Sequence, residues 1–406
     1  MARGAAVTSS SAAENSSRNN SNPIDEMPVC PYAKRCGGCD YQGMVYRRQL
    51  AVKENLVRRE LRPFVRIHPI TGADNPYHYR NKAHAVATRT RNGKVVTGIY
   101  MEGTHRVVPV SSCQIEDEKA DAILQTITRL IISFHIRIYD EDSGTGFLRH
   151  ILVRVGRKTG QILVILVGAS VVFSSKHSFV KALVEKHPEI TSIVLNVNPR
   201  HTNMVLGDRD IVLYGSGTIE DELCGKRFRI SPRSFYQVNS EMTEHLYRRA
   251  ISLAQLTGKE KVIDAYCGIG TIGIIASDYA KEVRAIELNR DAVRDAEYNV
   301  KTNRAGNVRV ISADATQYLV QAAARQVQAD VIFMDPPRSG STESFIYAAS
   351  QINPSRIVYI SCNPETLARD LGTFDRFGYQ AREAWPFDLF CFSKHVETVV
   401  LLTRDN

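Results

Sequence analysis

Hydrophobic and polar positions follow a regular pattern in the last third of the chain. Short runs rich in Val and Ile alternate there with stretches whose apolar positions recur three and four residues apart, such as 289–303. The apolar runs are 261–266, 282–288, 307–314, 329–335 and 356–362. This alternation predicts a parallel sheet with helices on both faces. Residues 379–390 and 395–404 have little between them, so they predict a closing hairpin and one antiparallel strand.

The pattern before residue 230 is different. Residues 93–101, 148–168 and 191–198 read as short alternating strands, separated by loops that contain Gly, Asn and Pro. They predict an α+β unit with antiparallel pairing. The longest apolar run, at 162–173, is too short to span a bilayer and is rich in Val and Ile. We therefore expect a buried strand there and no membrane segment.

These patterns divide the chain into three segments. Residues 1–27 are small and polar, lack the apolar stretch of a secretory signal, and predict a disordered tail. Residues 28–229 form the predicted central domain, and residues 230–406 form the predicted α/β domain. Without a signal peptide we expect a cytoplasmic protein, in which clustered thiols bind metal or react and seldom form disulfides. We also expect a monomer.

Charge indicates the kind of partner. The chain carries 52 Lys and Arg against 43 Asp and Glu, a net charge of +9, and so attracts polyanions. The excess is concentrated in two basic stretches, at 46–66 and 80–106. A solvated helix face is the ordinary explanation of such a stretch. Two of them in one basic protein favour a phosphate backbone, and therefore nucleic acid, as the partner.

A glycine-rich turn, "VIDAYCGIGTIG" at 262–273, joins a strand to a helix. Its glycines allow a tight turn in which a ligand approaches backbone amides, although such a turn can be purely structural. Glu287 ends the next strand, where a carboxylate accepts hydrogen bonds from ribose hydroxyls. Asp314 ends the third strand, where a carboxylate could receive an adenine amino group. The spacing departs from the dinucleotide fingerprint, so S-adenosylmethionine is favoured over a nicotinamide cofactor.

Two further residues end the fourth and fifth strands. Asp335, in "DPPR", stands at a rigid corner at the carboxyl end of the sheet, where open α/β folds bind ligands. The alternative is an Asp-Pro turn that only shapes a loop. Cys362 lies on the same rim, and a helix begins near Thr366, so we expect a thiol whose ionised form the helix N-terminus favours. A free cysteine can also be a small buried hydrophobe.

A thiolate that faces a methyl donor indicates one reaction in particular. C5 of a pyrimidine is a poor nucleophile, but addition of a thiolate to C6 makes C5 enolate-like and able to take a methyl group. The C5 proton then needs a base, and Glu397 is the candidate, with His395 two residues before it on the closing strand. Methylation of an exocyclic amine needs no thiol and usually places an aromatic residue after Asp-Pro-Pro. Arg338 follows here, which favours carbon methylation.

The motifs "FYQVN" (235–239), "DAYCGIGTIG", "DPPRSG", "YISCNPETLARD" and "HVETVVLL", in this order, resemble the bacterial RNA uracil-5-methyltransferase family over residues 28–406. The resemblance implies a Rossmann-like seven-stranded methyltransferase domain, preceded by an α+β domain that binds RNA and an iron–sulfur cluster. It implies that Cys362 is the nucleophile and Glu397 the base. It also implies that S-adenosylmethionine binds to Gln237, Tyr266, Glu287 and Asp335. One departure is "LFCFSKHVET", where members commonly have "MFPHT" before the closing strand.

Four cysteines form a second group. Cys30, Cys36 and Cys39 have the spacing C-x5-C-x2-C, and Cys113 is a distant fourth. Four thiolates suit zinc or an iron–sulfur cluster, and the spacing leaves both open. The resemblance implies the [4Fe-4S] ligands of the ribosomal branch of the family. We expect this cluster to organise an RNA-binding surface without a redox cycle.

The resemblance also implies a substrate. The ribosomal branch methylates 23S rRNA, which is therefore the expected substrate, with tRNA as an alternative. A catalytically inactive RNA-binding iron–sulfur protein is the alternative from a different class. Some relatives begin with a small β-barrel RNA-binding domain of the TRAM type, and we expect none here. Arg149 and His150 are candidate contacts to a bulged nucleotide, because a base must leave its stack to reach the thiol.

Overall fold

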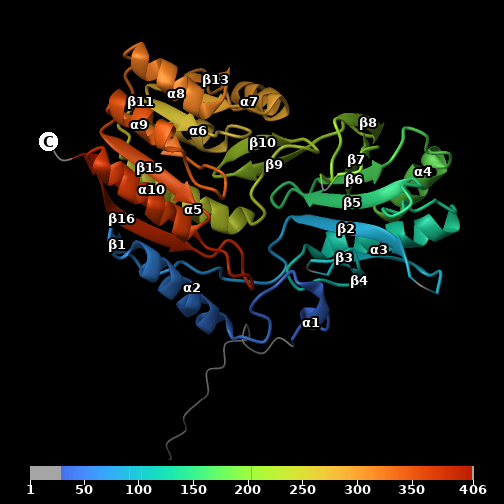
Figure 1. Cartoon of the computed structure of the whole chain (residues 1–406). Coiled ribbons are helices and arrows are strands. Elements are labelled where there is room, and N and C mark those ends of the chain that lie inside the picture. The colour runs from blue at the N-terminus through green and yellow to red at the C-terminus, as the bar shows by residue number, and fades with distance from the viewer. Residues whose placement is uncertain (1–28, 91, 102, 203, 405–406) are drawn as a thin grey trace, which may run out of the picture.

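Two large sheets organise the part of the chain that the computed structural model describes, residues 29–404 without 91, 102 and 203. The predicted tail at 1–27 lies outside these residues. The sheets lie side by side, each with its own helices (Figure 1). In the described ranges, no helix is long and apolar enough to cross a membrane.

The C-terminal sheet has the predicted α/β architecture. Its strand order is β1-β16-β17-β15-β14-β11-β12-β13, and β17 runs antiparallel to both of its neighbours. The predicted parallel sheet and its antiparallel closing strand are therefore confirmed. The strands are β1 (Arg66–Ile67), β11 (Lys261–Ala265), β12 (Glu282–Glu287), β13 (Val308–Ser312), β14 (Val331–Met334), β15 (Arg356–Ser361), β16 (Tyr379–Phe387) and β17 (Glu397–Arg404).

Helices cover both faces of this sheet because side chains alternate along each strand. In β11, Val262 belongs to one apolar core and Ile263 to the other; in β14, Phe333 and Met334 separate in the same way. The first core also contains side chains of α5, α6 and α7, and the second those of α8, α9 and α10. These helices are α5 (Ser240–Ala254), α6 (Thr271–Ala276), α7 (Arg290–Thr302), α8 (Ala315–Ala324), α9 (Glu343–Ile352) and α10 (Pro364–Arg376).

The central sheet has the strand order β4-β3-β2-β5-β6-β7-β8. All its pairs are antiparallel except β6–β7, which α4 connects as a crossover. Every residue of β6 is buried, which confirms a buried strand in the first part of the long apolar run at 162–173; the strand ends at Gly168, and Val171 and Val172 are exposed. Helices α3 and α4 pack on one face of this sheet. The elements are β2 (Lys82–Arg89), β3 (Val95–Tyr100), β4 (Val107–Pro109), α3 (Glu118–Ser133), β5 (Leu148–Val155), β6 (Ile162–Gly168), α4 (Lys176–Lys186), β7 (Ile190–Val197) and β8 (Arg209–Tyr214).

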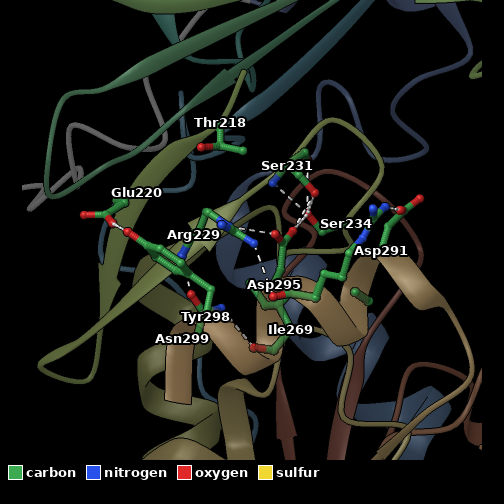
Figure 2. Close-up of polar contacts among 12 residues, drawn as sticks. Thr218, Glu220, Arg229, Ser231, Ser234, Ile269, Asp291, Asp295, Tyr298 and Asn299 are labelled. Carbon is green, nitrogen blue, oxygen red and sulfur yellow. Dashed lines mark hydrogen bonds and ion pairs between the residues drawn. The ribbon is translucent and has the colours of Figure 1, made fainter. Parts of the chain in front are cut away.

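A hairpin of β9 (Ile219–Leu223) and β10 (Lys226–Ile230) joins the two sheets (Figure 1). Figure 2 shows how α7 holds it. The buried carboxylate of Asp295 accepts hydrogen bonds from Arg229 at 2.8 Å, from Ser234 at 3.0 Å, and from Ser231. Asn299 accepts from the backbone N–H of Arg229 and donates to the carbonyl of Ile269 in the glycine-rich turn. These contacts fix the approach of residues 235–239 to that turn.

One part of the N-terminal segment packs on the C-terminal sheet. Helix α2 (Tyr46–Leu61) contacts α10, and β1 pairs in parallel with β16. Val57 and Leu61 of α2 are fully buried in the core beneath α10. The predicted boundary at residue 229 assigns α2 and β1 to the central domain, whereas they pack on the C-terminal sheet. The remaining short helix, α1 (Ala33–Cys36), lies outside both sheets.

A fully buried ion pair fastens α2 to the chain after β16. Lys53 Nζ lies 2.6 Å from Asp388 Oδ1, and both side chains are inaccessible to solvent. We expect Lys53→Met to lower the free energy of unfolding by about 3–5 kcal/mol, because it leaves a buried carboxylate without its cation. Urea unfolding measures the difference. Arg58→Ala is the matched control, because Arg58 pairs with Glu54 on the same helix but is 43% exposed; its cost should stay below about 1 kcal/mol. Equal losses in the two variants would contradict this expectation.

Candidate active site

The glycine-rich turn after β11 has an unusual backbone. Tyr266, Gly268 and Gly270 all have positive φ, at 64°, 58° and 84°, and Gly270 caps α6. Positive φ is costly for a tyrosine and is kept only where the surroundings fix it. Asp264, just before the turn, holds the helix that follows it, since its Oδ2 accepts from the Gly273 N–H at 2.8 Å. No atom lies within 4 Å of the position that a Cβ on Gly268 would take, so this turn faces open space in which a ligand can reach the backbone.

The two predicted acids both hold backbone at the carboxyl end of the sheet. Glu287 Oε2 accepts from the Gly268 N–H at 2.9 Å, and its Oε1 accepts from the Asn289 N–H at 2.7 Å. Asp314 caps α8 by accepting from the Gln317 N–H at 2.9 Å. A carboxylate oxygen accepts more than one hydrogen bond, so these roles leave room for ligand hydroxyl and amino groups.

One cleft brings three of the predicted cofactor residues together. Gln237, Tyr266 and Asp335 line it, next to Gly268. Phe235 lines the cleft too, and its side chain is 66% exposed, which is a high value for a phenylalanine. Phe235 belongs to the "FYQVN" motif, but the sequence prediction included only Gln237. The position of this aromatic residue, two residues before a predicted ligand, is the feature from which its place in the cleft could have been predicted. The other lining residues are Leu223, Tyr236, Tyr247, Cys267, Ile269, Thr271 and Ile272.

Strand register places Cys362 beside Glu397. Ser361, the last residue of β15, pairs with Thr398 of the antiparallel strand β17. Cys362 follows Ser361 and Glu397 precedes Thr398, and the charge of Glu397 raises the pKa of the Cys362 thiol, so the two side chains lie near each other. Cys362 is followed at once by Asn363, the N-cap of α10. The thiol and the carboxylate therefore share the rim of the sheet that Asp335 also borders.

The carboxyl groups of this rim have raised pKa values. Glu397 is 3% exposed, and its Oε2 has no hydrogen-bond partner among the described residues. Burial, and then the charge of Asp335, raises the pKa of Glu397 well above its ordinary value. Burial raises the pKa of Asp335 to about 7. Two such carboxyl groups resist ionising together, so the pair retains a proton near neutral pH. A buried oxygen without a partner beside a thiol indicates a group that waits for a ligand.

Cys362 is a neutral thiol in this setting. Burial raises its pKa to about 11, and the charges of Glu397 and Asp335 add to the shift, while Arg338 lowers it. The sequence prediction that the helix N-terminus favours the thiolate is therefore wrong for the protein groups alone. Desolvation and two nearby acids outweigh the partial charge of the helix end. A cation bound between Cys362, Glu397 and Asp335 would lower the pKa of the thiol and favour the thiolate.

This pKa predicts the reactivity of the free enzyme. Iodoacetamide reacts with the thiolate, so its rate at Cys362 should rise about tenfold per pH unit from about pH 7 to 10. An ordinary cysteine would level off near pH 8.5. Mass spectrometry of the peptide that contains Cys362 measures the rate. A plateau below pH 8 in the native protein would contradict the raised pKa.

Two further predictions do not agree with the structure. His395 precedes β17, so it does not share the strand face of Glu397; its ring nitrogen Nδ1 lies 2.6 Å from Arg338. Arg149 is 2% exposed, and its guanidinium binds Glu141 and two backbone carbonyls, so it is not available to a nucleotide. His150 is also buried, and its Nδ1 lies 3.3 Å from the Nε2 of His84.

The four cysteines of the second group line one cavity of about 330 Å³. In residues 29–404 as described, no three His, Cys, Asp or Glu side chains converge closely enough to hold one metal ion. Zinc with sulfur ligands at about 2.3 Å requires such convergence. The thiols surround a space instead, and an iron–sulfur cluster separates its ligands more widely than one ion does. Arg80 and Lys82 also line the cavity and can balance the charge of thiolates. The donor set thus fits a cluster, which stays a prediction.

Protonation of these thiols depends on what they bind. Burial raises the pKa of Cys39 to about 11 and that of Cys113 to about 12, so with protein groups alone they are neutral. A thiol that ligates a metal gives up its proton. Binding of a cationic metal centre therefore reverses the cost of ionising these side chains.

Comparison with known proteins gives a consistent picture. A family model described as tRNA (uracil-5-)-methyltransferase matches residues 45–405. An uncharacterized RNA methyltransferase of Caldanaerobacter subterraneus is 41% identical over 381 residues, 93% of this chain and 84% of that protein. One from Halalkalibacterium halodurans is 39% identical over 382 residues, 93% and 83% of the two chains. The crystal structure of Pyrococcus abyssi tRNA (uracil-54, C5)-methyltransferase in complex with S-adenosyl-L-homocysteine has a TM-score of 0.75 at 25% identity, over 90% of this chain and 86% of that one.

Proposed function

Because the chain belongs to the tRNA (uracil-5-)-methyltransferase family, we propose that it transfers a methyl group from S-adenosylmethionine to C5 of a uridine in RNA, with Cys362 as nucleophile and Glu397 as base. The observation that carries this proposal is the juxtaposition of a thiol with a buried carboxyl group whose Oε2 lacks a partner in the described residues. A C5 methyltransferase needs both groups on one rim. An amine methyltransferase has no use for the thiol.

The cofactor would occupy the cleft beside the glycine-rich turn. There, Gln237, Tyr266 and Asp335 would contact it, with Glu287 toward the ribose and Asp314 toward the adenine. S-adenosylmethionine supplies the methyl group and a positive sulfonium. A sulfonium bound near Asp335, Glu397 and Cys362 would lower their raised pKa values and so favour their ionised forms.

The protein groups then act in order. The Cys362 thiol loses its proton to water, its sulfur bonds to C6 of the uracil, and the electrons of the C5–C6 double bond move toward C5 and the C4 oxygen. C5 would take the methyl group from the cofactor, as the bond between the methyl carbon and the sulfonium sulfur breaks and its electrons stay on that sulfur. A carboxylate oxygen of Glu397 removes the C5 proton. The C5–C6 double bond forms again, the bond from C6 to Cys362 breaks, and the thiolate is regenerated.

We propose 23S rRNA as the substrate, with support from the four cysteines of the second group. The tRNA alternative has support from the Pyrococcus abyssi structure, whose enzyme is described as acting on tRNA. Incubating purified protein with labelled S-adenosylmethionine and separate rRNA and tRNA fractions from a strain that lacks it tests both. We expect 5-methyluridine in the 23S rRNA fraction. Label in tRNA alone would overturn the rRNA assignment, and no label in either RNA would indicate an inactive RNA-binding protein.

We also propose that Cys30, Cys36, Cys39 and Cys113 hold a [4Fe-4S] cluster, because four thiols and two cations line one cavity. Anaerobic purification should give four irons and four sulfides per chain, on the order expected from four thiolate ligands. Cys36→Ser should lose most of the iron, whereas Cys224→Ser, outside the cavity, should keep it. Stoichiometric zinc without sulfide would overturn the assignment.

A further inference from the structure

The loop that leads to Glu397 is held by segments far away in the chain. We name residues 388–395, between β16 and β17, the base loop. Its first residue, Asp388, accepts from Lys53 at 2.6 Å and from the Tyr46 hydroxyl at 3.0 Å. Lys53 also donates to the carbonyl of Phe390 at 3.0 Å. The start of the loop is therefore fixed on α2.

The middle of the base loop is held by the segment that carries three of the four cysteines. We name residues 29–44 the cysteine lobe. The backbone N–H groups of Asp40 and Tyr41 both donate to the carbonyl of Phe392, each at 2.9 Å. The Lys394 N–H donates to Asp40 Oδ2 at 2.9 Å. The N–H of Phe392 donates to the buried Gln49 side chain at 3.0 Å. Every one of these bonds joins the base loop to the N-terminal segment.

Phe392 needs this support. Its φ is 65°, a conformation that costs a bulky residue energy and persists only where neighbouring contacts impose it. Its ring lies 5.0 Å from that of Tyr77. Without the bonds from Asp40 and Tyr41, the backbone at Phe392 would relax toward negative φ. The chain two to five residues later, which includes Glu397, would move with it.

Apolar packing adds a second connection. Cys391 and Phe392 are buried in a small core with Tyr46, Tyr79 and Ile115. Cys39 and Cys113, two of the proposed cluster ligands, pack against the same core. The wall of the four-cysteine cavity and the base loop are therefore packed against each other. Because the packing is dense, a displacement of the cavity wall also displaces the base loop.

The far end of the base loop borders the reacting groups. His395 contacts Arg338 at 2.6 Å, and Arg338 is close enough to Cys362 to lower the pKa of its thiol. Glu397 follows two residues later. Hydrogen bonds thus connect Asp40, next to Cys39, to Phe392 and Lys394, and the chain itself leads from there to Glu397.

We propose that the cysteine lobe is a positioning element for catalysis, which acts through Asp40 on the base loop and holds Glu397 in place to remove the C5 proton. This inference rests on the function proposed above. It assigns the lobe a task at the last chemical step, in contrast to the predicted role in organising an RNA-binding surface. Disordering the lobe then slows release of the RNA from Cys362 more than it weakens RNA binding.

Asp40→Ala and Asp40→Asn test the proposal. The asparagine keeps an acceptor for the Lys394 N–H and the alanine does not. We expect Asp40→Ala to lower turnover by roughly 10–100-fold with little change in RNA affinity, because a misplaced base loses reactivity and not binding. Denaturing gels should show RNA covalently bound to the protein. Asp40→Asn should restore most of the turnover, and hydrogen exchange at the Lys394 amide should be faster in the alanine variant alone.

Lys394→Ala is the matched control. It removes the 3.7 Å ion pair with Asp40 but leaves the backbone N–H that donates to it, so turnover should stay near that of the native protein. The Asp40 side chain is 39% exposed, so both of its variants are expected to fold, which thermal unfolding checks.

Three outcomes would overturn the proposal: native turnover in Asp40→Ala, lost RNA affinity without trapped RNA, or equal effects of the alanine and asparagine. Native protein that methylates no RNA would instead remove the function on which the proposal rests.

Discussion

Cys362→Ala should abolish methyl transfer, with turnover falling by roughly 10⁴-fold or more, because it removes the sulfur proposed to add to C6 of the base. The same change should abolish the covalent complex with RNA that contains 5-fluorouridine, in which fluorine at C5 prevents the elimination step. Labelled methyl transfer and denaturing gels measure the two effects. RNA and cofactor affinity should change little, since the sulfur acts only after both have bound.

Cys224→Ser is the control for this experiment. Cys224 lies outside both the cleft and the cysteine cavity, so its variant should keep native turnover and native trapping. Trapping of Cys362→Ala at the native level would mean that another nucleophile forms the adduct. Failure of the native protein to trap fluorinated RNA with cofactor bound would count against covalent catalysis as a whole.

Glu397→Gln should stall the reaction after methylation. The amide cannot accept the C5 proton as a base, so turnover should fall by roughly 10²–10⁴-fold. The bond to Cys362 forms without this base, and the methylated RNA should therefore accumulate as an adduct on ordinary, unfluorinated substrate. A gel shift that is stable to denaturant, with one methyl group per trapped RNA, is the expected result.

Glu383→Gln provides a comparison on the neighbouring strand. Glu383 lies on β16, is 42% exposed and contacts His68, so its variant should turn over normally and trap nothing on ordinary RNA. If Glu397→Gln neither slows turnover nor accumulates adduct, the base is another group. If it loses the adduct together with turnover, Glu397 acts before the C5 proton is removed.

Much of the C-terminal sheet could be predicted because its local and global signals agree. Each of the parallel strands β11 to β15 is a short run that contains Val and Ile, and parallel strands bring their carboxyl ends to one edge. Glu287, Asp335 and Cys362 therefore had to lie on one rim once the alternation was recognised. The closing hairpin followed in the same way, from two apolar runs with little between them.

The burial, partners and pKa values of the predicted residues could not be predicted from the sequence pattern. The pKa of Cys362 depends on burial and on acids from two other strands, which no local motif reports. Arg149 looked available because its partners, Glu141 and the carbonyls near residue 200, belong to other parts of the central sheet. The fastening of the base loop by Asp40 joins positions more than 350 residues apart. Such contacts come from the tertiary fold and leave no periodic trace.

The parallel pairing of β1 with β16 means that β1 cannot join its sheet until β16 has been synthesised. On the ribosome, Arg66 and Ile67 emerge long before Glu383 and Ala384, the residues with which they pair. Until then α2 has nothing to cover Val57 and Leu61, and the completed strands of the sheet keep an open border. Docking of α2 and β1 onto α10 and β16 must therefore come late in folding, and it is a slow step because it joins segments far apart in the sequence. Until α10 and β16 are made, Val57 and Leu61 of a nascent chain lack the core that covers them in the folded protein.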